Sequence, residues 1–232
     1  MSGFSFSTTA GTSQSTTKPR LAGNDIYQVK FEGCELKDVA GVKDTSVTYK
    51  QLILKFGNED GVFEHTVWEP KADDFIRKDS EFVNKNGQTE KIPQPSGVET
   101  MMLLFKHAID TLNPTVAKQI DSNERNLGAA NWDDLRTMVA KILDAGKGVT
   151  TSIKLLTNKS GEAIFPGFFT GLTKEGKAYV RNNFIGSKIS FSAYEVKRIK
   201  DAATAKPTKP DTFVAPGAST ENFDMNFDVA DL

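Results

Sequence analysis

The residues of this chain with the most specific chemistry form the pentapeptide Lys177-Ala178-Tyr179-Val180-Arg181. Alternate side chains of an extended strand point the same way, so Lys177, Tyr179 and Arg181 would share one face. Lysine and arginine displace counterions from phosphates, and a tyrosine ring gives a flat surface on which an unpaired base can stack. The pattern is therefore typical of a surface that follows a single nucleic-acid strand. Taken alone, the pentapeptide also fits an ordinary solvent-exposed face with one tyrosine, which is the commoner case.

The sequence around this pentapeptide is basic and rich in aromatic residues. Residues 147–200 contain eight lysines and two arginines against three glutamates, a net charge of +7, together with seven Phe and Tyr residues. Some of the rings must belong to a core, and we assign Phe191 to it with Ile189 and Ala193. The interleaving of cations and rings favours nucleic-acid binding. The candidate binding residues are Lys154, Lys159, Phe165, Phe168, Lys174, Lys177, Tyr179, Arg181, Phe184, Lys188, Tyr194, Lys197 and Arg198.

The charge reverses after this block. Residues 201–232 contain two lysines against six acidic residues, a net charge of −4, and they begin with an Ala, Thr, Lys and Pro composition that is typical of a linker. The final residues combine acids, which mimic phosphates, with apolar anchors, so we expect them to compete with nucleic acid and to recruit partner proteins. A purely solubilising end is the alternative. The candidate partner-binding residues are Phe223, Asp224, Phe227, Asp228, Asp231 and Leu232.

Enzyme motifs are absent from the sequence. It has no phosphate-binding glycine loop, no Gly-x-Ser-x-Gly elbow and no His-Glu-x-x-His segment. The pairs Asp73-Asp74 and Asp133-Asp134 leave a magnesium-dependent nuclease as an alternative. Adjacent residues on a helix point about 100° apart, however, and acids are favoured at a helix start in any case. We therefore expect no enzymatic activity, no cofactor and no metal site.

Cysteine usage and hydropathy bound the cellular setting. Cys34 is the only cysteine, so an internal disulfide and a thiolate zinc cluster are excluded, and we expect a buried, unreactive thiol. The first residues lack the features of a secretory signal, and no run reaches the roughly 18 apolar residues of a membrane span. We expect a soluble protein of the cytoplasm, or of the host cytoplasm if the protein is viral, with no membrane partner. Homo-oligomerisation is left open.

The chain divides into three predicted parts. Residues 1–20 are predicted to be a disordered arm, residues 21–200 to fold, and residues 201–232 to form the linker and tail. Within the folded part, strand patterns cover residues 25–36, 47–56 and 62–68, which predicts an antiparallel meander. His65 is expected on the same side of its strand as Phe63 and Val67, and the role of Trp68 is left open.

The middle of the chain has helical periodicity. Residues 71–146 are interpreted as a helical insertion that starts with a polar loop at 71–97. Helices are predicted after the capping residues Ser96 and Asn131, with a short one at 114–120 and with Trp132 in the core. Strands are predicted again at 149–157, 162–169, 177–182 and 188–199.

Three strands, a helical insertion and further strands occur in the order of an OB-fold, a small Greek-key barrel with its helix between the third and fourth strands. The sequence thus predicts a mainly β protein with an OB-fold-like antiparallel barrel and disordered ends, although other small α+β barrels have a similar order.

With these residues in view, the chain resembles the single-stranded DNA-binding proteins of tailed bacteriophages over roughly residues 21–232. The similar parts are the strand block 24–68, Ile153-Lys154-Leu155-Leu156 followed by residues 158–169, and the linker with its acidic end. The resemblance implies an OB-fold, binding to strands exposed in DNA replication, recombination or repair, and a tail that recruits replication proteins. Bacterial members end in several Asp, a Pro and a final Phe, whereas this chain has spaced Asp residues and ends in Leu232. A phage virion or assembly protein with a structural barrel is the second interpretation of the sequence.

Overall fold

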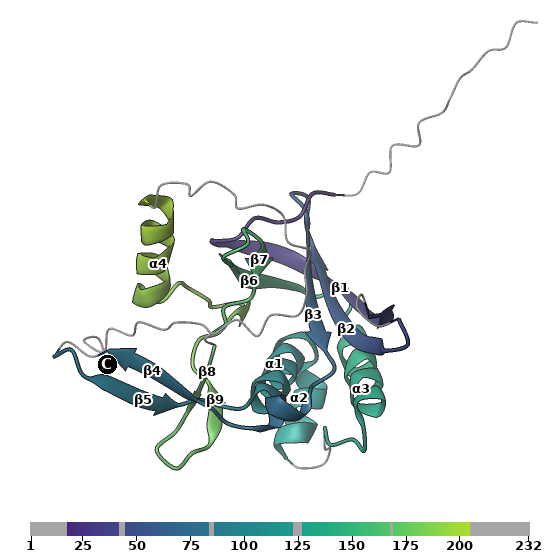
Figure 1. Cartoon of the computed structure of the whole chain (residues 1–232). Coiled ribbons are helices and arrows are strands. Elements are labelled where there is room, and N and C mark those ends of the chain that lie inside the picture. Colours follow the sequence, from purple (N-terminus) through teal and green to yellow (C-terminus); the bar gives the residue numbers. More distant parts are fainter. Residues whose placement is uncertain (1–17, 42–44, 84–85, 123–126, 168, 205–232) are drawn as a thin grey trace, which may run out of the picture.

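The computed structural model describes residues 18–41, 45–83, 86–122, 127–167 and 169–204 (Figure 1). Most of the predicted N-terminal arm and all six candidate tail residues lie outside the described residues. The described part is mainly β, with a curled antiparallel sheet that forms a half-barrel, and it contains four α-helices. The helices of the middle segment follow the first three strands, so the predicted order of elements is confirmed at this level.

The first three strands form the predicted meander. β1 (Asp25–Ala40) pairs with β2 (Thr48–Gly57), and β2 pairs with β3 (Val62–Trp68), in both cases antiparallel. Alternation places Leu52, Leu54 and Phe56 of β2 on one buried face. The alternation of apolar residues that predicted these strands therefore also determines which of their faces points into the core.

β1 is longer than predicted because it pairs with two neighbouring strands. Its first part, residues 25–30, pairs with β6 (Thr150–Thr157), and residues 30–40 pair with β2. The register with β2 shifts between Phe31 and Gly33, and Gly33 has a φ of 113°, which an L-residue rarely adopts. The bulge bends the strand, so that the sheet has the order β10-β6-β1-β2-β3.

Three helices form in the middle segment, as predicted. α1 (Gly97–Leu112) begins after Ser96, whose hydroxyl accepts from Glu99 N while Glu99 Oε2 accepts from Ser96 N. α2 (Pro114–Asp121) follows directly, and α3 (Trp132–Asp144) begins after Asn131, whose side chain accepts from Asp134 N. The capping residues therefore mark both long helices correctly.

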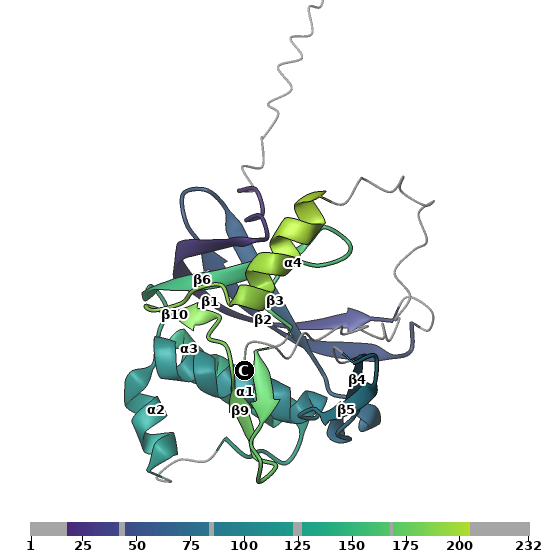
Figure 2. The same ribbon diagram turned by 90° about the vertical axis from the view of Figure 1, so that its left-hand side faces the viewer.

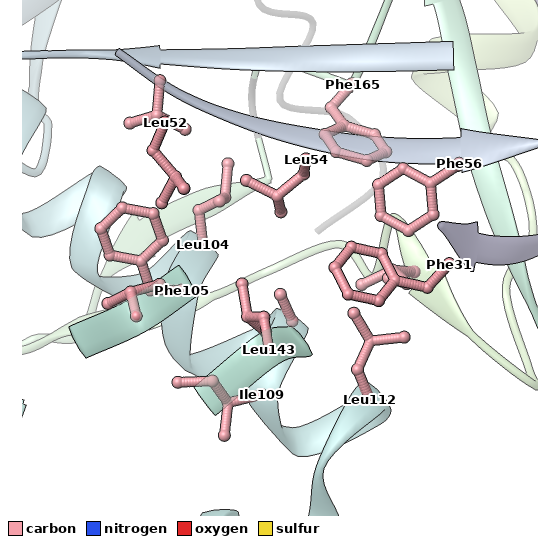
Figure 3. Close-up of a cluster of buried hydrophobic side chains, with 14 of the residues drawn as sticks. Phe31, Leu52, Leu54, Phe56, Leu104, Phe105, Ile109, Leu112, Leu143 and Phe165 are labelled. Carbon is pink, nitrogen blue, oxygen red and sulfur yellow. The ribbon is translucent and has the colours of Figure 1, made fainter. Parts of the chain in front are cut away.

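The core lies between the inner face of the sheet and the helices. Figure 3 shows Phe31, Leu52, Leu54 and Phe56 of the sheet facing side chains of α1 and α3. Trp132 is buried as predicted, and its indole N–H donates to Lys50 O at 3.3 Å. Arg136 of α3 is also buried and donates to Asp38, Asp133 and the carbonyl of Gln51. These bonds fix α3 to the end of β1 and the start of β2, which pair with each other.

Residues 71–97 are not a simple loop, which corrects the prediction. They contain a 3₁₀ turn η1 (Ala72–Phe75) and a hairpin of β4 (Asp79–Val83) and β5 (Thr89–Pro93). Four of the five β5 side chains are exposed. Backbone hydrogen bonds pair the two strands, and the β5 side chains bury little surface, so alternation of apolar residues gives no signal for β5.

The predicted strand at 188–199 is wrong, because α4 (Ala193–Thr204) occupies most of it. Ser192 Oγ accepts from Glu195 N at 3.2 Å, and Glu195 Oε2 accepts from Ser192 N at 2.7 Å, so the pair forms a capping box. The alternation of Ile189, Phe191 and Ala193 belongs to the segment before the helix and to its first residue. The Ser-x-x-Glu spacing of Ser192 and Glu195 is the sequence signal that marks the start of this helix.

The remaining strands are shorter than predicted. β7 (Ala163–Ile164) and β10 (Ile185–Gly186) both pair with β6, whereas β8 (Thr170–Leu172) and β9 (Ala178–Val180) form a separate two-stranded hairpin. In both views α4 lies near β6, apart from α1, α2 and α3 (Figures 1 and 2).

The environment of His65 predicts that the stability of the protein depends on pH. Its ring packs beside Phe63 and Phe165, at 4.8 Å between the His65 and Phe165 centroids, and burial lowers its pKa to about 4. The folded protein thus keeps His65 neutral while the unfolded chain takes up a proton below about pH 6.5. Stability contributed by the neutral ring is complete above pH 6.5 and should fall by about 2–3 kcal/mol towards pH 4.

The measurement is urea unfolding of the wild type and of His65→Gln between pH 4 and 7. The difference between the two curves should show the decline. His107→Gln, at the other histidine, whose pKa burial also lowers, should leave the part of the decline that is due to His65 in place. Parallel curves for wild type and His65→Gln would rule out a lowered pKa for His65 in the folded protein.

Candidate nucleic-acid interface

The pentapeptide of residues 177–181 lies on the β8–β9 hairpin and has the predicted alternation. Lys177, Tyr179 and Arg181 are exposed, whereas Ala178 and Val180 are half-buried, and Val180 packs against the core. Tyr179 keeps 39% of its surface exposed. Two cations and a ring therefore share one solvent-facing side of the hairpin.

The hairpin is attached to the body of the protein at its base. Arg181 N donates to Phe169 O at 2.6 Å, and the hydroxyls of Thr100 on α1 and Thr170 on β8 lie 3.4 Å apart. At its other end, Gly176 has a φ of 77° and its N–H donates to Thr173 O, which closes the turn that carries Lys174. The base is fixed by core contacts, and the turn projects from it.

Arg77 lies beside this turn. Its Nη1 atom is 3.5 Å from the position that a Cβ on Gly176 would occupy, and its guanidinium forms an ion pair with Glu99. The hydrogen bond from Arg77 lowers the pKa of Glu99 to about 2. Arg77 lies in the 71–97 segment that was predicted to be a loop, so sequence spacing gave no reason to group it with Lys174.

Three candidate binding residues are buried, which corrects their predicted place on the surface. Phe165 and Phe184 lie 4.6 Å apart between ring centroids and belong to the core cluster, and Phe165 also contacts Phe63 at 4.9 Å. Lys154 is only 1% exposed. Alternating cations and rings in a sequence do not show which rings point inward, and Phe168 lies outside the described residues.

The other candidates lie on separate elements. Lys159 is in the turn between β6 and β7, Lys188 follows β10, and Tyr194, Lys197 and Arg198 are on α4. Arg198 is half-buried and the other four are exposed. The structure thus places the candidate residues of the basic block that are not buried on three separate parts of the chain: the β6–β7 turn, the β8–β9 hairpin, and α4 with the segment before it.

A buried ion pair attaches α4 to the sheet. Lys154 Nζ donates to Glu195 Oε2 at 2.8 Å and to Ser190 O at 3.0 Å, and Glu195 is 4% exposed. Ile153 and Leu155 point into the core, so Lys154 between them points to the opposite face of the sheet. Phe191 covers the ammonium group, with its ring centroid 5.9 Å from Nζ. Phe191, expected in the core, is instead half-buried.

One exposed aromatic pair lies outside the predicted binding residues. Tyr49 of β2 and Trp68 of β3 are 39% and 51% exposed, and their rings meet edge to face at 6.2 Å between centroids. Trp68 lies opposite Gln51 in the ladder, so both rings stand on the outer face of the sheet, away from Leu52. The period-two pattern of β3 contains the signal, because Trp68 falls out of phase with the inward-facing Phe63 and Val67.

Two recesses lie outside the hairpin. The larger, of about 760 Å³, is at the bend of β1, where Lys18, Lys30 and Lys147 line it together with Glu32 and Glu59. The smaller, of about 440 Å³, lies between α1 and residues 183–188 and includes His107 and Lys188. Burial lowers the pKa of His107. Of the twelve candidate residues within the described ranges, Lys188 alone lines either recess.

The acidic pairs that suggested a nuclease have structural partners. Asp74 Oδ2 accepts from Lys71 N at 2.7 Å, and Asp133 forms ion pairs with Lys50 and Arg136. Within the described ranges, no three His, Cys, Asp or Glu side chains are grouped so that they could hold a metal ion. Cys34 is half-buried, and burial beside Asp144 raises the pKa of its thiol to about 12.

Comparison with known proteins gave no match to a family model, a curated protein or a solved structure. None of the helices in the described part of the chain combines the length and apolar character that a membrane crossing requires.

The Lys154–Glu195 pair gives a test of how α4 is attached. Glu195→Gln should lower the free energy of unfolding by about 3 kcal/mol, because the Lys154 charge then remains buried without a counter-charge. The double variant Lys154→Met/Glu195→Leu should recover most of that loss, since it buries two neutral side chains of similar size. Urea unfolding measures both. Equal stability of the wild type and Glu195→Gln would show that the pair does not hold α4.

Proposed function

We propose that this protein binds single-stranded DNA without strong sequence preference and protects exposed strands in replication, recombination or repair. The observation that carries the proposal is the solvent-facing side of the β8–β9 hairpin, where Tyr179 is exposed between Lys177 and Arg181. Cations neutralise the phosphates and a ring stacks on an unpaired base, a combination that a duplex does not need.

The distribution of charge supports the same proposal. Lys174, Lys188 and Lys197 are exposed on the hairpin turn, after β10 and on α4, so exposed cations precede and follow Tyr179 along the chain. The long-range attraction of such a surface for a polyanion is independent of base sequence. We expect affinity to arise mostly from this term.

The topology also supports an OB-fold, which we propose as the finer description of the half-barrel. β1 pairs with both β2 and β6, and the helices lie between β3 and β6, as the OB-fold order requires. OB-folds bind oligonucleotides across their second and third strands, and here Tyr49 and Trp68 are exposed on β2 and β3. These rings are a second stacking surface in the proposal.

The tail has two roles in the proposal. Its acids compete with DNA for the cations, and its apolar residues recruit replication or recombination proteins. α4 ends at Thr204, so the remaining residues 205–232 start from an element that already carries Lys197 and Arg198. A tether of this length keeps the acids at about millimolar effective concentration near the basic elements.

Titration of a fluorescent single strand of about 20 nucleotides tests the binding proposal, since one OB-fold covers about 4–16 nucleotides. With about four to six phosphates contacted, log affinity should fall against log salt with a slope of roughly −3 to −4. A chain truncated after residue 204 should bind more tightly at low salt, and the gain should shrink as salt screens the competing acids.

A duplex of the same length is the control for single-strand preference, and added magnesium reveals any cleavage. Salt-independent binding, or equal affinity for duplex and single strand, would contradict the proposal. Unchanged low-salt affinity after truncation would leave the tail without its competing role, and loss of partner pull-down on truncation tests recruitment separately.

Tyr179→Ala tests base stacking. It should weaken single-strand binding by about 1–3 kcal/mol and leave the free energy of unfolding nearly unchanged, because the ring is on the exposed face. Its neighbour gives the matched control: Val180→Ala should lower stability by about 1 kcal/mol through lost packing, with binding per folded molecule unchanged. Lys177→Ala should flatten the salt slope by about 0.7. If Tyr179→Ala unfolds the protein and spares binding, the ring is structural.

A further inference from the structure

Gly171 of β8 has no backbone reason to be glycine. Its φ lies outside the left-handed region, where a β-carbon is disfavoured, so its conformation is open to other residues. In the ladder it is directly opposite Tyr179, and a side chain at this position would stand beside the tyrosine ring on the same face. The reason for a glycine at this position must therefore be the space that a side chain would occupy above the strand.

The guanidinium of Arg181 fills that space. Measured from the position that a Cβ on Gly171 would take, Arg181 Nη2 lies at 2.8 Å, Nε at 3.0 Å and Cζ at 3.2 Å. Both nitrogens are closer than the carbon between them, so the Nε–Nη2 edge faces β8 and Nη1 points away from it. Arg181 is two residues beyond Tyr179, which brings its side chain diagonally across the hairpin to the residue opposite the ring.

We infer that Gly171 is a positioning residue that holds the Arg181 guanidinium beside Tyr179, ready to take a phosphate next to a stacked base. An arginine free in solution loses up to about 2 kcal/mol of side-chain entropy when a ligand orders it. An arginine held against the strand has lost part of that freedom on folding, so binding costs less. The ligand class is the sugar–phosphate backbone of a single strand, and the inference rests on the proposed function.

The test is a double-mutant cycle between Gly171→Ala and Arg181→Ala. A β-carbon at 171 meets the end of a flexible side chain, so Arg181 moves away and the fold is kept. Gly171→Ala should weaken single-strand binding about three- to tenfold with the salt slope unchanged, because the charge remains. Arg181→Ala should flatten the slope by about 0.7. In the Arg181→Ala background, Gly171→Ala should have no further effect.

Gly167→Ala is the matched control, because a β-carbon at Gly167 meets no atom within 4 Å and its φ is also outside the left-handed region. It should bind like the wild type. A second readout needs no DNA: ¹⁵N relaxation of Arg181 Nε should show an ordered guanidinium in the wild type and a mobile one in Gly171→Ala.

The outcomes separate the two proposals. If Gly171→Ala weakens binding equally with and without Arg181, or has no effect, the positioning role is wrong while single-strand binding stands. A mobile Arg181 Nε in the wild type also overturns it. If the wild type does not bind single strands, the proposed function fails, and an ordered Arg181 then has no role in positioning a phosphate.

Discussion

Between Phe31 and Gly33 strand β1 bends, and hydrogen bonds near this point join it to the end of α3 and to the segment before β6. Cys34 N donates to Asp144 Oδ1 at the end of α3, Gly148 N donates to Phe31 O, and Phe31 N donates to Val149 O just before β6. One strand can therefore pair with β6 before the bend and with β2 after it. A straight β1 would give a flatter sheet, and the inner face would not curl around α1 and α3.

The curled sheet has two faces with different chemistry. The inner face is apolar and packs on the helices, so its stability follows from burial. The outer face carries Lys154, whose charge is buried only because Glu195 neutralises it. A buried ion pair contributes less net stability than an apolar contact of the same size, but it requires one partner in one position. It accordingly serves to place α4, and with it Lys197 and Arg198, next to β6.

The sequence predicts the elements whose side chains are sorted by burial. Period-two and period-3.6 patterns identify β1, β2, β3, β6 and the helices α1 and α3, because each has an apolar face that packs in the core. They fail for β4 and β5, which are held by backbone hydrogen bonds, and for α4, where a short alternating segment outweighed the Ser192–Glu195 cap. At the candidate site the faces of Tyr179 and Val180 are predictable from alternation. The burial of Phe165 and the contact between Gly171 and Arg181 are not, because both depend on which distant segments meet.

Burial of Lys154 does not reduce the net positive charge that residues 147–200 present to solvent. Lys154 and Glu195 are removed from the surface together, so residues 147–200 keep their net charge of +7 on the remaining side chains. What changes is where the charge lies: besides Lys147 before β6 and Lys188 after β10, the exposed cations are on the β6–β7 turn, on the β8–β9 hairpin and on α4. Electrostatic attraction alone would not fix the position of a bound strand on these elements. In the proposal, the Tyr179 ring beside a positioned Arg181 would hold one nucleotide of the strand in a defined place.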